Sequence, residues 1–591
     1  MRSLEPMLNI IGYISRVAGP LVEAASVAEA QMLEMVEVGD DHLIGEIVRL
    51  SGKKITMQVY EDTTSLRPGL PVYGSGMPLA VELGPGLIGT IYDGIQRPLD
   101  VIRLASGSYI QKGIHAPALD RKKRWHFKPQ VKAGDNVAPG AVMGTVPETA
   151  LVEHRVLVPH PLCGRVVSIV DESECTLDDI IAVITMNGRE KPVYLYQRWP
   201  VRQGRLFRSR DRLTEPLITG QRVIDTLFPV VKGGAVAVPG GFGTGKTIVQ
   251  HQLAKWCDAD IIIFIGCGER GNEMTDVLLS FPKIIDPRSG RSLMERTILI
   301  ANTSNMPVAA REASIYTGIT CAEYYRDMGY HVAVMADSTS RWAEALRELS
   351  GRMEELPADE GFPAYLPTRL AEFYERAGAV ETLSGQHGSV TIIGSISPPG
   401  GDFAEPVTQH TKRCVRCFWA LDKDLANARH YPSISWIESY SEYREEIGDW
   451  WCAHIDPDWR VMQQEIMGLL QQEERLKQVV KLVGPDVLQD NQKVLLETCL
   501  IFRTTFLQQS SFDAIDMFSV PQKQARMLRI ILGFHKQCLE AIKSGMTLEH
   551  IRKSRLRSDV LKMKWAIGNA ELEKFDALRR EVEAFAREGS V

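Results

Sequence analysis

The chain has 591 residues, of which 44% are hydrophobic and 24% charged, and its formal net charge is −6. This balance is typical of folded protein and excludes wholesale disorder, while the length implies about three to five domains. Because 68 basic residues stand against 74 acidic ones, no overall field draws the chain to nucleic acid or anionic lipid. The most apolar stretch, residues 259–266, is far below the ~20 residues of a membrane-spanning helix, and Glu5 and Pro6 exclude an ordinary signal peptide.

The cysteines argue against a disulfide framework. Ten cysteines in so long a chain favour a reducing compartment. Cys414 and Cys417 form the one CxxC pair in the sequence, but a structural zinc site needs a second pair or histidines at ligand spacing. We therefore interpret this pair as part of a buried strand or helix edge, and not as a metal or redox site.

The first eighty residues predict a small β-barrel. Ile55, Met57 and Val59 alternate with more polar residues, which is the period-2 pattern of a half-buried strand, and glycines and prolines separate several such runs. Residues 115–190 again have a β-like, Gly/Pro-punctuated pattern. Within them, residues 121–128 are basic with interleaved aromatics, which is typical either of a nucleic-acid patch or of a solvated strand edge. The acidic charge elsewhere favours the strand edge.

From about residue 230 to 400 the sequence predicts alternating strands and helices. Apolar runs predict strands at 235–238, 261–265, 298–301, 332–336 and 390–393, with helices at 247–255, 273–279 and 307–328. That alternation is typical of a parallel sheet with crossover helices. Beyond about residue 440 the apolar residues recur at helical spacing, as in Leu476, Val480 and Val483 and again in Phe575, Leu578, Val582 and Phe585. The tail is therefore expected to be a helical domain.

A phosphate-binding motif stands inside the strand–helix region. The pattern GxxxxGK[ST] is matched in full by Gly240, Gly241, Phe242, Gly243, Thr244, Gly245, Lys246 and Thr247. A strand is expected before it and a helix after it, which is the context that gives the motif meaning. Its glycines let backbone N–H groups surround phosphate oxygens at a helix N-terminus. Lys246 then reaches the β- and γ-phosphates, and the Thr247 hydroxyl ligates Mg²⁺.

Two further segments supply the groups that a phosphoryl-transfer enzyme needs. Asp337 ends an apolar strand and is expected to hold Mg²⁺ through water. Glu269 and Arg270 follow the strand at 261–265, where ligands bind in such sheets. Glu269 can orient an attacking water and Arg270 can offset phosphate charge.

Together with several longer blocks, these residues make the chain resemble the catalytic A subunit of the rotary V-type and A-type ATPases. The resemblance covers almost the whole length. Its matching blocks are 83–87 (Leu-Gly-Pro-Gly-Leu), 93–98 (Asp-Gly-Ile-Gln-Arg-Pro), 216–222 (Pro-Leu-Ile-Thr-Gly-Gln-Arg), 266–274, 336–342 (Ala-Asp-Ser-Thr-Ser-Arg-Trp), 397–402 (Ser-Pro-Pro-Gly-Gly-Asp) and 506–509 (Phe-Leu-Gln-Gln). Several such blocks in the right order are far more specific than a P-loop alone.

The resemblance implies a fold of four parts. These are an N-terminal β-barrel (residues 1–82), an inserted β-rich bulge domain (115–190), a RecA-like α/β P-loop nucleotide domain (83–114 and 191–440) and a C-terminal α-helical domain (441–591). The insertion is absent from F-type catalytic subunits. In the family, three A subunits alternate with three non-catalytic B subunits around a central stalk rotor. ATP binds at the A–B interface, and a peripheral stalk and a membrane sector that moves H⁺ or Na⁺ complete the machine.

The resemblance also assigns roles to residues. Lys246 and Thr247 match the phosphate and Mg²⁺ contacts for ATP or ADP, Glu269 the catalytic carboxylate, and Asp337 the magnesium-associated acid. Arg270 and Arg341 match phosphate-side arginines. Tyr431 resembles the aromatic wall of the adenine pocket, and Phe506 or Phe512 another wall, against the alternative that these aromatics pack in the core. Residues 482–486 resemble the helical-domain loop that faces the rotor.

One departure and three rivals qualify the resemblance. Eukaryotic A subunits carry a cysteine where this chain has Thr244, so redox control through that cysteine does not carry over, and a prokaryotic source is expected. The resemblance also implies that the chain lies in a soluble sector on the cytoplasmic face of a membrane. The rivals are a hexameric RNA translocase, an export-type ATPase of secretion systems and a non-catalytic nucleotide-binding scaffold. We expect no nucleic-acid partner. Whether the complex pumps or synthesises, and which ion it moves, is decided on other chains.

Overall fold

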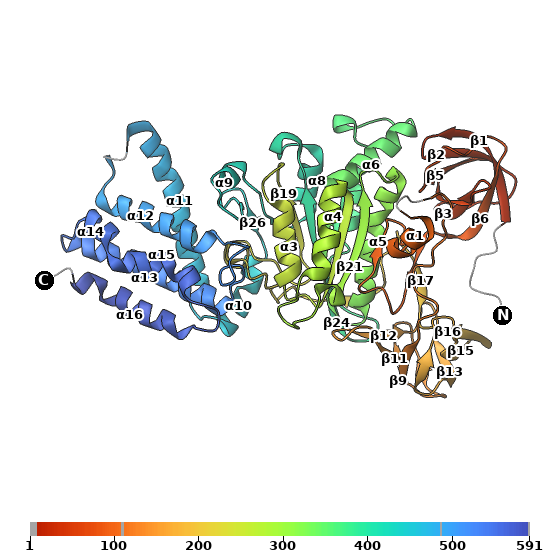
Figure 1. Ribbon diagram of the computed structural model, residues 1–591, viewed down its shortest axis with the longest axis horizontal. Coiled ribbons are helices and arrows are strands. Elements are labelled where there is room, and N and C mark those ends of the chain that lie inside the picture. The colour runs from red at the N-terminus through yellow and green to blue at the C-terminus, as the bar shows by residue number, and fades with distance from the viewer. Residues whose placement is uncertain (1–8, 108–110, 485–486, 589–591) are drawn as a thin grey trace. The chain divides into compact units, whose positions relative to one another are not determined.

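The computed structural model describes residues 9–107, 111–484 and 487–588 (Figure 1). The chain divides into two compact units. The first unit contains residues 1–212, 259–398 and 403–414, and the second unit contains residues 213–258, 399–402 and 415–591. Among the described residues, no helix combines the length and the apolar character that crossing a membrane requires.

The N-terminal part of the first unit is a closed six-stranded barrel, as the period-2 pattern predicts. The strands follow the order β1-β2-β5-β4-β3-β6. Their bounds are β1 Asn9–Ala18, β2 Leu21–Ser26, β3 Glu34–Val38, β4 Leu43–Ser51, β5 Lys54–Val59 and β6 Pro71–Pro78. Ile55, Met57 and Val59 are buried with Val22, Val36 and other aliphatic side chains in one core, so the barrel is filled by its own side chains.

The inserted segment forms two four-stranded antiparallel sheets. One has the order β10-β13-β15-β16 and the other β12-β11-β9-β14. Their bounds are β9 Trp125–Pro129, β10 Asn136–Val137, β11 Val142–Pro147, β12 Glu153–Leu157, β13 Gly164–Ile169, β14 Ser173–Cys175, β15 Ala182–Met186 and β16 Arg189–Val193. Strand β7 (Ala80–Leu83) precedes the insertion and strand β17 (Gln197–Pro200) follows it, and the two strands pair with each other. The chain segments that lead into and out of the insertion therefore lie side by side.

The basic stretch at 121–128 does not form a sheet edge, so that prediction is wrong. Strand β9 lies between β11 and β14, and its exposed His126 pairs with Glu172 and Glu174. Arg121 pairs with Glu82 at 2.5 Å. Carboxylates from neighbouring segments therefore neutralise part of this charge, a partnership that the local sequence does not show.

The rest of the first unit is a parallel sheet with crossover helices, as predicted. Its strand order is β24-β22-β20-β21-β8, and all four neighbouring pairs are parallel. The bounds are β8 Ile91–Tyr92, β20 Ile261–Glu269, β21 Thr297–Thr303, β22 His331–Asp337 and β24 His387–Ile396, and β18 Ser209–Arg210 and β23 Gly378–Glu381 extend it antiparallel. The helices are α1 Leu99–Ser106, α4 Gly271–Ser280, α5 Val308–Asp327, α6 Thr339–Arg352, α7 Leu366–Tyr374 and α8 Pro406–Cys414.

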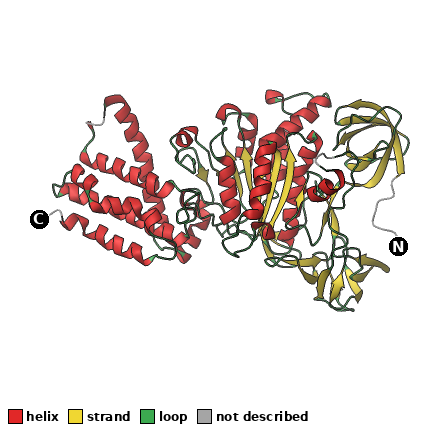
Figure 2. Cartoon of the chain, viewed as in Figure 1, coloured by secondary structure: helices red, strands yellow, loops and turns green. Residues whose placement is uncertain are grey.

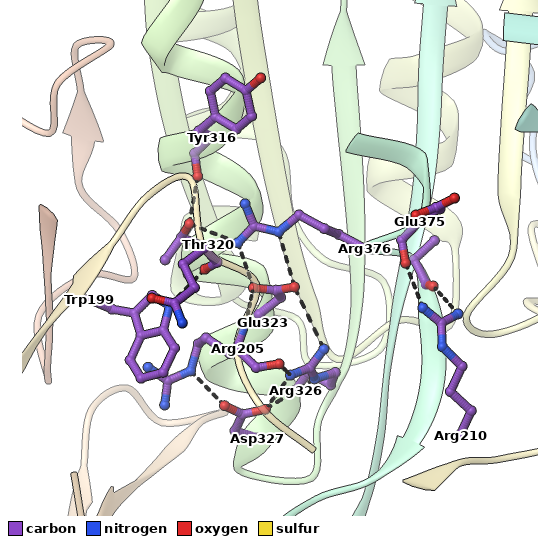
Figure 3. A network of polar contacts seen from close by, with 12 residues as sticks. Trp199, Arg205, Arg210, Tyr316, Thr320, Glu323, Arg326, Asp327, Glu375 and Arg376 are labelled. Atoms are coloured by element: carbon purple, nitrogen blue, oxygen red, sulfur yellow. Dashed lines mark hydrogen bonds and ion pairs between the residues drawn. The ribbon is translucent and has the colours of Figure 1, made fainter. Parts of the chain in front are cut away.

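Helix α5 is buried along nearly its whole length, and a network of ion pairs fixes its C-terminal half (Figure 3). Glu323 accepts hydrogen bonds from the Arg376 guanidinium, at 2.5 Å from Nη2, and Asp327 accepts from Arg205 Nε at 2.6 Å. Burial alone would raise the pKa of Glu323, but the charge of Arg376 holds that pKa below its ordinary value. Glu323 is thus charged, and guanidinium groups satisfy both buried carboxylates.

The second unit combines a short strand–helix segment with a helical tail (Figure 2). Its strands follow the order β26-β25-β19, with bounds β19 Ala235–Pro239, β25 Cys417–Phe418 and β26 Tyr440–Ser441. The helices are α2 Arg222–Leu227, α3 Lys246–Trp256, α9 Lys423–Asn427, α10 Arg444–His454, α11 Trp459–Val483, α12 Asp490–Ile501, α13 Pro521–Lys543, α14 Leu548–Lys553, α15 Arg555–Ala566 and α16 Glu573–Glu588, and a π-helical turn at Phe502–Leu507 continues α12. Of the loop expected to face a rotor, Pro485 and Asp486 lie outside the described residues.

Candidate active site

The P-loop motif joins the buried strand β19 to helix α3 in the second unit. Gly243 and Gly245 have φ angles of +81° and +83°, a left-handed conformation that residues with a Cβ rarely adopt. Gly240 also lacks room for a side chain, since a Cβ there would lie 2.6 Å from the Thr244 hydroxyl oxygen. The glycines are therefore required by a backbone path that presents N–H groups at a helix N-terminus, where phosphate binds.

Lys246 and Thr247 are the first two residues of α3 and both are partly exposed. Thr244 is buried, and its hydroxyl donates to the Gly241 carbonyl at 2.8 Å. Ser433 donates from its hydroxyl to the Thr244 carbonyl at 2.6 Å. Thr244 thus fixes the loop from inside, while Lys246 and Thr247 remain accessible to a ligand.

Tyr431 provides an aromatic surface beside the P-loop within the same unit. A Cβ on Gly245 would lie 3.2 Å from the Tyr431 Cε1 atom, and 37% of Tyr431 is exposed. Phe506 is fully buried and stacks on Phe502 with ring centroids 5.0 Å apart. The expectation that Phe506 forms a wall of the base pocket therefore fails, because its ring packs in the core of the helical domain. Phe512 is 90% exposed, and its role remains a prediction.

The carboxyl ends of β20 and β22 bring two acids to one edge of the first unit's sheet. Strand β20 ends at Glu269 and β22 ends at Asp337, and the two strands are parallel neighbours in which Gly266 pairs with Asp337. Asp337 is buried, whereas Glu269 is partly exposed and Arg270, the N-cap residue of α4, is exposed. This is the edge at which open α/β sheets bind their ligands.

Two arginines confine the turn that precedes Glu269. Gly268 has a φ of +70°, and a Cβ there would lie 2.8 Å from both the Arg311 Cδ and the Arg341 Cβ. Arg341 pairs with Glu344 at 2.7 Å. The hydrogen bond from Arg341 to Glu344 raises the pKa of Arg341, with a smaller contribution from the charge of Glu269. The turn thus has little freedom, and positive charge lies close to the carboxylate.

The comparisons with known proteins agree over nearly the whole chain. Residues 220–441 match the family described as ATP synthase alpha/beta family, nucleotide-binding domain. Residues 14–76 match that family's β-barrel domain, 116–202 its barrel-sandwich domain and 448–552 the C-terminal domain of V and A type ATP synthase. The V-type ATP synthase alpha chain of Halothermothrix orenii is 56% identical over 97% of this chain and 98% of its own. The chain belongs to the A-subunit family of the V-type and A-type ATP synthases.

Other relatives have the same full-length similarity. The corresponding A-type ATP synthase protein of Thermococcus sibiricus is 55% identical over 94% of this chain and 95% of its own, and that of Methanopyrus kandleri is 54% identical over 97% and 98%. The assembled ATPase EscN of an enteropathogenic E. coli type III secretion system has a TM-score of 0.62 at 19% identity, covering 88% of this chain and 100% of its own; this likeness shows the fold alone. Membership of the A-subunit family makes the chain an ATP hydrolase/synthase with the catalytic role in a rotary ATPase, as the resemblance predicts.

Two arginines, one in each unit, were not predicted from the sequence. Arg311 lies against Gly268, and its Nη2 donates to the Ser304 carbonyl at 3.1 Å. An arginine in the first turn of the helix after β21 is a usable signal, because that helix starts at the same carboxyl edge of the sheet. Arg222, in the block at 216–222, is fully buried, and nothing in its local sequence indicates why.

Proposed function

We propose that this chain binds ATP with its P-loop and Tyr431 and hydrolyses or forms the γ-phosphate bond with Glu269. The observation that carries the proposal is the accessible Tyr431 ring beside the last P-loop glycine, at 3.2 Å from the Cβ position of Gly245. A phosphate cradle with an adjacent aromatic face suits a nucleotide better than a bare anion, because the base can stack on the ring. Lys246 reaches the β- and γ-phosphates from the start of α3.

The donor set fits magnesium. Thr247 offers a hydroxyl oxygen and Asp337 a carboxylate oxygen, and hard oxygen ligands of this kind suit Mg²⁺, which keeps several of its waters. We assign Thr247 to direct ligation and Asp337 to a contact through water. When bound, the ion neutralises charge on the β- and γ-phosphates.

The carboxylate and the arginines act on the transferred phosphoryl group. Glu269 accepts a hydrogen bond from the attacking water and so holds its oxygen in line with the γ-phosphorus. Arg270 and Arg341 offset the negative charge that spreads over the equatorial oxygens. An arginine from a neighbouring B subunit completes the site; a group of that kind is worth ~10³–10⁵ in rate, so the chain alone is expected to hydrolyse ATP slowly.

Membership of the A-subunit family supports a proposal for the assembly in which the chain works. We propose a ring of three copies of this chain and three B subunits around a rotor stalk, with a peripheral stalk and a membrane sector that moves H⁺ or Na⁺. The chain then lies in a peripheral sector on the cytoplasmic face. Thr244 in place of the eukaryotic P-loop cysteine supports a prokaryotic source.

Substitution of Glu269 tests the proposal directly. In the assembled complex, Glu269→Gln is expected to bind MgATP as the wild type does but to lose at least ~10²-fold in hydrolysis, since positioned acid–base groups contribute about that much. Lys246→Ala is expected to weaken nucleotide binding itself. Glu273→Gln, which changes another acid in the first turn of α4, is the matched control. Near wild-type turnover by Glu269→Gln, or unchanged affinity in Lys246→Ala, contradicts the assigned roles.

A further inference from the structure

We infer that Arg222 is a positioning residue for nucleotide binding: its buried guanidinium fixes the loop that holds Tyr431 at the base side of the P-loop. The inference rests on the proposed role of Tyr431 and adds to it the residue that sets the position of this ring. Arg222 is the first residue of α2 and is fully buried. A buried cation without full pairing is costly, so its partners indicate what it is built to hold.

Those partners belong to the segment at 506–516. Arg222 Nε donates to the Phe506 carbonyl at 2.6 Å and Nη2 to the Gln508 carbonyl at 2.9 Å. Nη1 forms an ion pair with the Asp516 carboxylate at 2.7 Å. Three atoms of one rigid guanidinium thus fix three points of this segment, and a lysine has no equivalent planar fork.

The segment in turn holds the backbone of Tyr431. Gln509 donates its backbone N–H to the Tyr431 carbonyl at 2.8 Å. The Gln509 side chain contacts the start of α2: Oε1 accepts from the Arg222 backbone N–H at 2.8 Å, and Nε2 donates to the Gly220 carbonyl at 2.9 Å. Ser433 ties the other side of Tyr431 to the P-loop through the Thr244 carbonyl at 2.6 Å. The backbone that carries the Tyr431 ring is therefore held on both sides, and Arg222 holds the segment on one of them.

A second layer of cations strengthens the same loop. Lys564 Nζ donates to the Gln508 carbonyl at 3.2 Å and to the Thr504 carbonyl at 2.7 Å. Lys523 Nζ donates to the Lys564 carbonyl at 2.8 Å. The Gln508 carbonyl therefore accepts from both Arg222 and Lys564, so two buried cations hold the loop from its core side.

The test compares ATP with pyrophosphate as ligands of the full-length chain, both with Mg²⁺. Arg222→Lys is expected to raise the Kd for ATP about tenfold, the effect of losing one buried charge-assisted contact, and to leave the Kd for pyrophosphate unchanged. In a Tyr431→Ala background the same change is expected to have less than about a twofold further effect, because Arg222 acts through Tyr431. Arg296→Lys is the matched control, since Arg296 is also buried, pairing with Asp286 at 3.2 Å and donating to the Ala259 carbonyl at 2.9 Å.

The outcomes separate this inference from the proposed function. If Tyr431→Ala leaves the ATP affinity unchanged, the role of Tyr431 itself fails. If Tyr431→Ala weakens ATP but Arg222→Lys does not, or if Arg222→Lys weakens pyrophosphate equally or adds fully to Tyr431→Ala, the positioning role of Arg222 is wrong. Thermal unfolding reports whether each variant folds, and Asp516→Asn, which removes the paired charge with little change of shape, replaces Arg222→Lys in the same comparison if that variant does not fold.

Discussion

Substitution of Gly268 by alanine tests whether the turn before Glu269 is as confined as the structure indicates. The residue has a φ of +70°, and forcing an alanine into this left-handed conformation costs about 1–2 kcal/mol. The new Cβ would also lie 2.8 Å from the Arg341 Cβ, and that atom is attached to α6 and cannot turn away as the end of a side chain can. The backbone at Gly268 must therefore shift, and Glu269 shifts with it.

The expected effect falls on hydrolysis more than on binding. A displacement of ~1 Å of a positioned catalytic group costs about 10²-fold in rate, whereas the P-loop and Tyr431 belong to other segments of the chain and keep their ligand contacts. Steady-state ATP hydrolysis by the assembled complex measures kcat, and nucleotide titration measures the Kd. We expect kcat to fall about 10²-fold and the Kd to change less than about twofold.

Gly271→Ala provides the matched control on the same loop. A Cβ at Gly271 meets nothing within 4 Å, and its φ is not positive, so an alanine at this first position of α4 is expected to be neutral or slightly stabilising. If the Gly268 variant keeps a kcat within about threefold of the Gly271 variant, the turn is not confined and Glu269 is not held by it. A large rise in the Kd would mean that the substitution acts on the phosphate cradle instead.

Two further predictions concern the buried charges of each unit. Arg202 pairs with Glu46 at 2.7 Å and with Glu312 at 2.8 Å. Because Arg202→Met leaves two buried carboxylates without their partner, we expect it to lower the free energy of unfolding, measured by urea titration, by about 3–5 kcal/mol. Adding Glu46→Gln and Glu312→Gln should recover most of this loss, and an absence of recovery would contradict the electrostatic cause. Burial lowers the pKa of Lys523 and Lys564 from 10.5 to about 8. Above about pH 8 the unfolded chain therefore binds more protons at these lysines than the folded chain does, and the contribution of each lysine to stability rises with pH. The free energy of unfolding of Lys523→Met relative to wild type should therefore fall by up to ~2 kcal/mol between about pH 8 and 10, and a difference independent of pH would show that this lysine is not titrating there.

The parts of the fold that depend on local pattern were predictable. The apolar run at 261–265 predicts a strand, and the structure extends it as β20 to Glu269. The extension has no local signal, because Gly266 and Gly268 interrupt the apolar run. It comes from pairing with β21, in which Cys267 lies opposite Asn302 and Glu269 opposite Thr303. Period and propensity indicate that a strand exists, and tertiary pairing determines where it ends.

Burial separates residues that look alike in sequence. Tyr431 and Phe506 are both aromatics in recognisable blocks, yet Tyr431 is exposed and Phe506 is stacked on Phe502 in the core. The difference arises because Phe506 continues α12 through a π-helical turn, so the packing of that helix decides which way the ring faces. A motif therefore locates a segment that carries candidate aromatic residues, but which side chain is exposed to a ligand depends on contacts formed on folding.

The positioning residues are the part of the proposed site that is hardest to predict from the sequence. A P-loop is readable because phosphate binding needs certain residue types at fixed local spacing, and Lys246 follows its glycines directly. Arg222 has no such neighbours, since the carbonyls that it holds at Phe506 and Gln508 are 284 and 286 residues away along the chain. Backbone carbonyls carry no residue-type signature, so an arginine that binds them looks like any other. The groups proposed to touch the nucleotide are thus indicated by motif, whereas the groups that hold them in place are found only through three-dimensional contacts.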